Sequence, residues 1–294
     1  RELIEDLAKH PQAKGTLGQK IGSLYNLAMD SVRRNREGIA PLRPVLAKVR
    51  DIKSKKDYQL VVAQLDRKGA AAMMFDFGIS ADIRNAAMNL VNISQGGISL
   101  GERDYYLNDD STTVKVRNAY KAYIKKLFTM VGDDQSTAEK KMQAVMAIET
   151  QIAKASYSAT QLRDVEGNYH KMSYAQLLKD FPGIDWEATR TALGFPTFQE
   201  VTVNQIEPLH EVEKILNDYT LDDLKAYAEF KVIDAAANAL DDNFRAASFD
   251  FYSKTMSGAQ QDRPRWKRAV GVVNGVLGMA VGKMYVEKYF PEAA

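Results

Sequence analysis

The sequence of 294 residues contains no cysteine and only three histidines, His10, His170 and His210. Without cysteine, the chain can form no disulfide bond, no thiolate zinc site and no cysteine nucleophile. Zinc hydrolases of the HExxH type need two histidines four residues apart on one helical face, with a glutamate beside the first to deprotonate the metal-bound water. No two histidines here have that spacing. The sequence therefore predicts no catalytic residue and no metal ligand.

The segment nearest to that pattern is His210-Glu211-Val212-Glu213-Lys214. Its fifth position is a lysine, and a protonated ammonium has no lone pair for zinc. We interpret the segment as part of an amphipathic helix with its charges exposed. The buried side of this helix is expected to consist of Leu209, Val212, Leu216 and Tyr219.

A strong excess of one charge is also absent. Forty Lys and Arg residues stand against 38 Asp and Glu residues, which gives a formal net charge of +2. A dedicated nucleic-acid binder carries a marked basic excess. We therefore expect no nucleic-acid partner.

The longest apolar run, residues 269–281, is interrupted by Asn274 and followed by Lys283. It is shorter than the roughly 20 residues that cross a bilayer, so we expect a buried helix and no membrane span. The chain starts at Arg1 inside a helical pattern, without an initiating Met or a signal peptide. We expect upstream residues to have been removed, which leaves the targeting of the protein unreadable.

The apolar residues that are present, 45% of the chain, suffice for a sizeable core in one large or two ordinary domains. Their spacing predicts a mostly α fold, a multi-helix lobe with one small β-hairpin. The hairpin is expected from two short apolar segments, residues 72–80 and 87–94, separated by polar residues. Helices are expected over residues 17–34, 41–49, 58–67, 114–131, 139–157, 221–240 and 266–289.

Helix start signals support these positions. Ser136 to Glu139 and Ser173 to Gln176 fit capping boxes, and Thr220 precedes a helix with acidic residues in its first turn. The adjacent Asp241 and Asp242 suit helix capping or solvent better than an acid/base pair, because neighbouring helical residues point apart. Residues 183–204, with Pro182, Gly194 and Pro196, are the best candidate for a subdomain hinge, and a compact connection is the alternative.

Four cations, Arg263, Arg265, Lys267 and Arg268, surround Trp266 at the start of the last helix. Positive charge is unfavourable at a helix N-terminus, so these side chains need acidic partners. In the structural interpretation, the partner carboxylates come from the same domain or from another part of the protein. In the functional interpretation, one or two of the cations hold the carboxylate of a peptide substrate.

Four glycines in the same helix, Gly271, Gly275, Gly278 and Gly282, share one side of it. Each destabilises a helix by up to about 1 kcal/mol relative to alanine. Their common face predicts that another backbone crosses closely there.

The loop from Gly96 to Tyr106 contains Arg103, Asp104, Tyr105 and Tyr106. These side chains suit either the wall of a peptide cavity or the anchoring of the loop by an ion pair and buried tyrosine rings. We favour anchoring. The candidate substrate or interlobe contacts are therefore Arg103, Asp104, Tyr105, Tyr106, Arg265, Trp266, Lys267 and Arg268.

Ordered landmarks along nearly the whole chain resemble those of the neprilysin and endothelin-converting enzyme family of zinc metallopeptidases, which includes the bacterial oligopeptidase O type. A GxxPL turn, a GGxxLxxRDYY loop, an RD pair, a YNKMS-like segment and a PRWKR helix start occur in the family's order. His170 replaces the usual asparagine of the fourth landmark. The matching residues are Gly38, Pro41, Leu42, Gly96, Gly97, Leu100, Arg103 to Tyr106, Arg163, Asp164, Tyr169, Lys171 to Ser173, Pro264 to Arg268, Gly278, Gly282, Tyr285, Val286 and Phe290.

The resemblance implies that residues 1–294 form the N-terminal, non-catalytic lobe of such a peptidase, whose zinc ligands follow later in the family's sequences. The chain itself would then hold no cofactor, and zinc would belong to an absent catalytic lobe. That lobe and short peptides would be its partners, and the full-length parent would be a zinc metalloendopeptidase. The resemblance further implies a periplasmic, surface or secreted location, and the missing cysteines favour a bacterial protein over disulfide-rich animal enzymes.

Two other interpretations remain open. The chain can be a standalone helical binding or scaffold protein that kept the lobe and lost catalysis. It can also associate with a separately supplied catalytic fragment.

Overall fold

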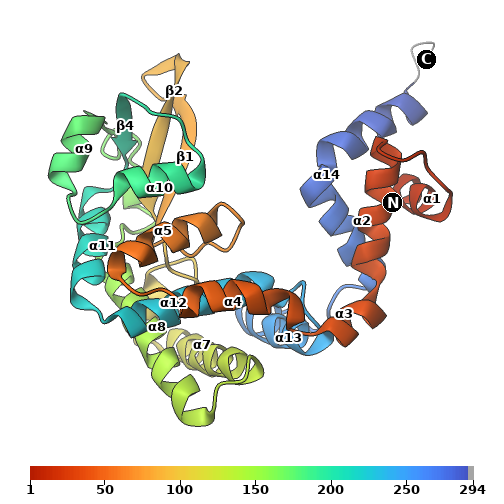
Figure 1. The fold of residues 1–294 in the computed structure, drawn as a ribbon, viewed down its shortest axis with the longest axis horizontal. Coiled ribbons are helices and arrows are strands. Elements are labelled where there is room, and N and C mark those ends of the chain that lie inside the picture. Colours follow the sequence, from red (N-terminus) through yellow and green to blue (C-terminus); the bar gives the residue numbers. More distant parts are fainter. Residues whose placement is uncertain (291–294) are drawn as a thin grey trace.

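A computed structural model describes residues 1–290, which form a mostly helical fold with two separate hydrophobic cores. A large unit holds the sheet and most of the helices, and a small unit stands apart from it (Figure 1). The small unit consists of α1 (Glu2–Lys9), α2 (Leu17–Met29) and α14 (Arg265–Tyr289). The two ends of the described chain therefore pack against each other.

Apolar residues on one side of each helix form the core of the small unit. Leu7, Ile21, Tyr25 and Val273 are buried there. Gly22 allows α1 and α2 to approach closely, because a side chain at this position would collide with the backbone carbonyl of Leu7.

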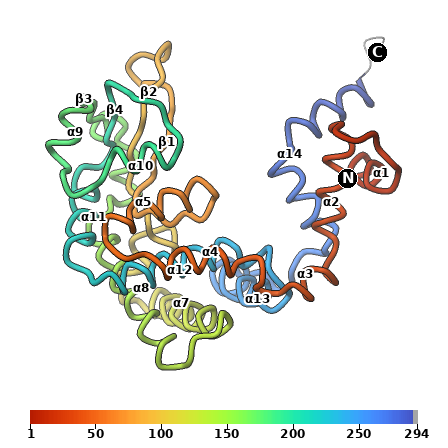
Figure 2. Tube along the Cα trace, in the orientation of Figure 1, coloured from red at the N-terminus to blue at the C-terminus, as the bar shows by residue number. Residues whose placement is uncertain are grey.

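The large unit is organised around α12 (Leu221–Ala237), in which Leu224, Tyr227, Phe230 and Ile233 are fully buried. Figure 2 traces the chain from α4 into α5 and later along α7 and α8 around this helix. The other helices are α3 (Ser31–Glu37), α4 (Arg43–Arg50), α5 (Lys55–Asp66), α6 (Asp104–Leu107), α7 (Ser111–Met130), α8 (Gln135–Ala155), α9 (Tyr174–Asp180), α10 (Trp186–Leu193), α11 (Ile206–Asp218) and α13 (Asp242–Ser248), with 3-10 turns at Ala40–Leu42 and Gln161–Arg163 and a π-helix at Phe249–Met256.

The predicted hairpin is confirmed as β1 (Phe75–Asp82) and β2 (Asn85–Gln95). Two further strands, β3 (His170–Ser173) and β4 (Glu200–Val203), extend it to a sheet of order β1-β2-β4-β3. The β2–β4 pair is parallel and the other two pairs are antiparallel. The two added strands have four residues each, too few for a clear alternating pattern.

Helix boundaries differ from the prediction where a local cap intervenes. The helix expected over residues 17–34 is broken at Asp30, whose side chain accepts a hydrogen bond from the Arg33 amide and starts α3. The predicted cap at Ser136 is wrong, because Asp134 is the N-cap of α8 and accepts from the Thr137 amide. The Ser173 cap and the reciprocal Thr220–Asp223 capping box are confirmed.

The predicted hinge segment, residues 183–204, contributes α10 and β4 to the large unit. Trp186 is buried in it, with its ring centroid 5.6 Å from that of Phe75. The chain passes between the two cores through residues 30–38, which include α3, and through residues 257–264. Hinge motion within residues 183–204 stays a prediction.

Candidate functional site

A large cavity lies where the two units meet, and we call it the junction cleft. It has a volume of ≈ 1100 Å³ and is lined by residues of α2, α3, α12, α13, α14 and the loop before α14. Figure 1 shows α3 and α13 at the base of the small unit, where α14 begins. The charged residues that line the cleft are Asp30, Arg33, Arg34, Glu37, Arg245, Asp262, Arg263, Lys267 and Arg268.

Asp262 connects α13 to the start of α14. Its carboxylate accepts from Arg245 Nε at 3.0 Å and Nη2 at 2.8 Å, and from Arg268 Nη1 at 2.9 Å. The same Arg268 nitrogen donates to the Arg263 carbonyl at 2.7 Å. One carboxylate therefore serves two half-buried guanidinium groups.

The carboxylate of Asp242 likewise lies between cations of α3 and α14. Arg34 Nη2 lies 2.8 Å from its Oδ1 atom, and Arg265 Nη2 lies 4.0 Å from Oδ2. Hydrogen bonds from Asn35 and then from Arg34 lower the pKa of Asp242. Arg265 also donates to the Ser31 hydroxyl, which ties the first turn of α14 to α3.

Burial, and next the charge of Arg245, lower the pKa of Arg268. Arg265 and Arg34 act in the same direction, whereas Asp262 opposes them. The cations at the start of α14 thus stand in a concentrated positive field, which two shared carboxylates offset only in part.

Trp266 does not line the junction cleft but lies over the N-terminus of the small unit. The Arg1 guanidinium is 3.9 Å from its ring centroid, a cation–π contact. Lys267 Nζ lies 5.4 Å from the same ring.

The loop from Gly96 to Tyr106 lies in the large unit, away from the lining of the junction cleft. The Tyr106 hydroxyl donates to Glu149 at 2.6 Å and accepts from the Ser99 and Leu100 amides at 3.1 Å each. Arg103 Nη1 donates to the Ser156 carbonyl. These bonds favour the anchoring interpretation. Tyr105 is partly buried against the core, and Asp104 occupies the first turn of α6.

The glycine face of α14 is open. A Cβ atom built on Gly271, Gly275, Gly278 or Gly282 would have nothing within 4 Å, so no segment of residues 1–290 crosses there as we had expected. Val276 and Met279 on the same helix are 67% and 92% exposed. The expectation of a buried helix was therefore wrong: only Ala269 and Val273 are buried, on the side toward α2.

By length and composition alone, α14 could also cross a membrane, because an 18-residue window has a mean hydropathy of 1.5. One such helix is weak evidence. The absence of a membrane span stays a prediction.

The histidines have structural contacts. His210 lies against the Phe181 ring and contacts Glu213, on a helix that buries Leu209, Val212 and Leu216 as expected. His170 Nδ1 is 3.0 Å from the Val203 carbonyl, and His10 lies beside Asp6. Across residues 1–290, no three His, Asp or Glu side chains are grouped to hold a metal ion.

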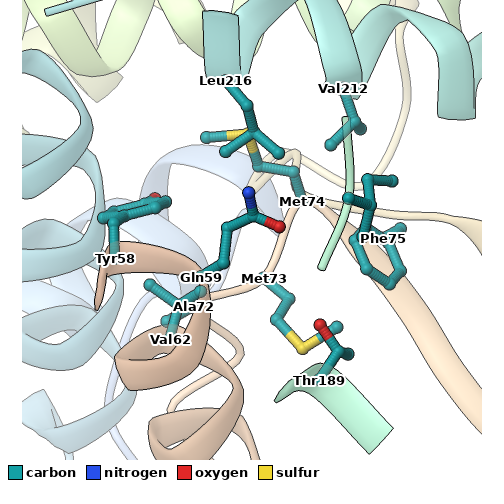
Figure 3. A pocket seen from close by; sticks show the side chains of 11 residues that line it. Tyr58, Gln59, Val62, Ala72, Met73, Met74, Phe75, Thr189, Val212 and Leu216 are labelled. Atoms are coloured by element: carbon teal, nitrogen blue, oxygen red, sulfur yellow. The ribbon is translucent and has the colours of Figure 1, made fainter. Parts of the chain in front are cut away.

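A second cavity, of ≈ 20 Å³, lies between α5, α11 and the segment before β1 (Figure 3). Met73, Met74 and Phe75 approach Val62, Val212 and Leu216 around it. The fully buried Tyr58 hydroxyl at this cavity has no hydrogen-bond partner among the described atoms. Burial raises the pKa of Tyr58. The cavity is too small for a substrate.

Sequence reasoning found the cations of the junction but missed their partners. Arg34 and Asp242 are separated by 208 residues, so no local pattern could pair them. Asp262, directly before Arg263, was the available signal for an acidic group near the cations. Asp241 was correctly assigned to capping, since it accepts from the Asn243 and Phe244 amides.

The fold and its landmarks match those of the N-terminal part of a metallopeptidase family, which defines the class of the protein. The family model described as Peptidase family M13 matches residues 1–294, and the chain belongs to that family. The chain is 26% identical over 305 residues to endothelin-converting enzyme 1 of Rattus norvegicus, covering 99% of this chain and 39% of the relative. Against the human enzyme the identity is 27% over 248 residues, with 81% and 32% covered.

Solved structures of metallopeptidases are similar to this chain. The zinc metalloprotease Zmp1 of Mycobacterium tuberculosis, in complex with an inhibitor, matches with a TM-score of 0.94 and 31% identity over 99% of this chain and 44% of Zmp1. PepO from Lactobacillus rhamnosis, at 19% identity and a TM-score of 0.80, shares the fold. The chain thus spans less than half the length of the relatives it matches.

Proposed function

We propose that this chain is the substrate-selecting, non-catalytic lobe of a zinc metalloendopeptidase that cleaves short peptides. Membership of Peptidase family M13 supports the reaction class of the parent. Residues 1–290 contain no group that fits a zinc ion, so no hydrolytic step is assigned to them. The zinc ion and the catalytic water would belong to polypeptide beyond this part.

The observation that carries the proposal is the open face of α14. Val272, Val276 and Met279 are 44%, 67% and 92% exposed beside glycines that have no neighbour. An apolar face of this kind is unfavourable in water, and the glycines would let another helix approach closely. It supports a role of α14 as a contact between this chain and the catalytic lobe.

The candidate contacts have different places in this proposal. Arg265, Lys267 and Arg268 lie where α14 begins, and Trp266 lies over the N-terminus of the small unit. All four would contact the catalytic lobe or a peptide. Arg103, Asp104, Tyr105 and Tyr106 would shape the large unit through the anchored loop. The parent would work outside the cytoplasm, a proposal that rests on the family resemblance alone.

Assays of the purified chain test the absence of catalysis. We expect neither stoichiometric zinc nor hydrolysis of a fluorogenic peptide. Both together, in a sample free of other peptidases, would overturn the proposal. Reading the coding sequence past Ala294 separates the alternatives, because an in-frame HExxH supports a peptidase and a stop codon favours a scaffold.

A leucine at Gly275 tests the α14 contact. In the isolated chain, Gly275→Leu meets open space and raises helix propensity, so stability should stay level or rise by up to about 1 kcal/mol. In the longer parent, the same change should reduce activity by separating the lobes. Lys20→Leu on the exposed side of α2 is the control and should leave activity unchanged. Full activity of the Gly275→Leu parent would refute the contact.

A further inference from the structure

The charges around the junction cleft do not balance among the described residues. Arg33 pairs with Glu37 at 2.7 Å, and Asp30 is occupied as the cap of α3. Asp262 is then the remaining carboxylate in the lining. The cations left to share it are Arg34, Arg245, Arg263, Lys267 and Arg268, of which Arg34 has Asp242 outside the lining.

Asp262 has no capacity for a further partner. Its Oδ1 atom accepts from Arg245 Nη2 and from the Arg263 amide, at 2.8 and 2.7 Å. Its Oδ2 atom accepts from both Arg245 and Arg268. The side chains of Arg263 and Lys267 form no ion pair within residues 1–290, although both are exposed in the cleft.

Arg268 keeps spare donors as well. It uses Nη1 for Asp262 and for the Arg263 carbonyl, whereas its Nε and Nη2 atoms form no hydrogen bond with the described residues. A guanidinium carries five N–H donors in a planar fork that matches a carboxylate or phosphate. A half-buried fork, a flexible ammonium and a second guanidinium therefore border one water-accessible space.

We propose that the junction cleft binds a small oxyanion through Arg263, Lys267 and Arg268. The anion would offset the positive field that the shared carboxylates leave around the start of α14. The cleft of ≈ 1100 Å³ has room for more than a free ion, so the oxyanion can be the terminal carboxylate of a short peptide as well as inorganic phosphate. The site itself does not depend on the proposed function; the peptide source does.

Calorimetric titration of the isolated chain with inorganic phosphate, at constant ionic strength, tests the site. We expect saturable binding that weakens about tenfold or more in the Arg263→Gln/Lys267→Gln double variant, because two charge-assisted contacts are lost. The control is Lys283→Gln/Lys288→Gln, which removes the same charge from the exposed end of the same helix. Circular dichroism confirms that both variants keep the helical fold.

A peptide pair separates the two sources. Trialanine with a free carboxylate should compete with phosphate if the cleft accepts peptide ends, and trialanine amide should not. Competition by neither peptide, with phosphate bound, assigns the site to an inorganic anion and leaves the site proposal supported. The proposal is overturned if neither phosphate nor the peptide acid saturates the chain, or if the control loses as much affinity as the double variant.

Discussion

The carboxylate of Glu149 lies 3.8 Å from the ammonium of Lys231, and both residues are buried in the large unit. Glu149 accepts hydrogen bonds from the hydroxyls of Tyr106, Tyr120 and Ser99 at 2.6–2.8 Å. Lys231 donates to the Gly97 carbonyl and to Ser99. This network joins α7, α8 and α12 to the Gly96 to Tyr106 loop.

Removing one member should leave the others without partners. Glu149→Leu is expected to lower the free energy of unfolding by about 3–5 kcal/mol, because the ammonium and three hydroxyls stay buried. Urea denaturation measures the loss. Glu139→Leu is the control: it lies on the same helix as Glu149, breaks an exposed pair with Lys125 of α7, and should cost far less. Equal losses of stability in the two variants would show that the buried network stabilises the fold no more than the exposed ion pair does.

The same loop contains a matched pair of glycines with positive φ, Gly97 at 88° and Gly101 at 80°. A Cβ atom on Gly97 would lie 2.9 Å from Met74 Cα, whereas one on Gly101 would have nothing within 4 Å. Gly101→Ala should therefore cost only the backbone strain, about 1–2 kcal/mol. Gly97→Ala should cost a further 1–3 kcal/mol or so from overpacking. Thermal unfolding compares them, and equal costs would refute the close approach.

Local patterns in the sequence suffice for much of this architecture. The β1–β2 hairpin and the long helices follow from periodicity within a few residues, and the Thr220–Asp223 box forms as expected. The strands β3 and β4 are too short to show a period; β3 pairs with β4, and β4 pairs with β2 across a long separation in the sequence. Their positions depend on tertiary contacts that no local window contains.

For the candidate site too, the sequence predicts some features, and others depend on tertiary contacts. Charge repulsion at the start of α14 predicts that acidic partners are needed, but Asp242 reaches Arg34 only because α3 and α13 meet in space. The glycine face of α14 was interpreted as a crossing point from its composition. Composition shows that a close partner is tolerated there, and cannot show whether the partner is within these residues.

Tyr58 offers a test of an unpaired buried hydroxyl. Since its oxygen has no partner among the described atoms, Tyr58→Phe breaks no protein hydrogen bond and should change the free energy of unfolding by less than about 1 kcal/mol, or increase it. Tyr227→Phe is the matched control, because the Tyr227 hydroxyl donates to the Gly97 carbonyl at 2.7 Å and the ring is equally buried. That change should cost roughly 1–2 kcal/mol. A larger loss at Tyr58 would mean that its hydroxyl is satisfied.

Acid should weaken the contact between α3 and α13 through Asp242. Hydrogen bonds from Asn35 and Arg34 lower its pKa in the folded state, so the folded protein releases this proton more readily than the unfolded chain. The stabilisation is then fully present above the unfolded pKa of about 3.9 and is lost as the pH falls through the lower folded value. Asp242→Asn should be less stable than the wild type near pH 6, and the difference should vanish toward about pH 2.

Melting temperatures of both proteins across this range measure the difference. Asn35→Ala removes the hydrogen bond that lowers the pKa of Asp242 most, and it keeps the Asp242 carboxylate. The acid-sensitive stabilisation by Asp242 should therefore become smaller in this variant without disappearing. A difference between wild type and Asp242→Asn that stays constant from neutral to acid pH would contradict the argument. It would mean that the Asp242 side chain contributes by packing and not by charge, because a charge-dependent contact must follow the protonation of its carboxylate.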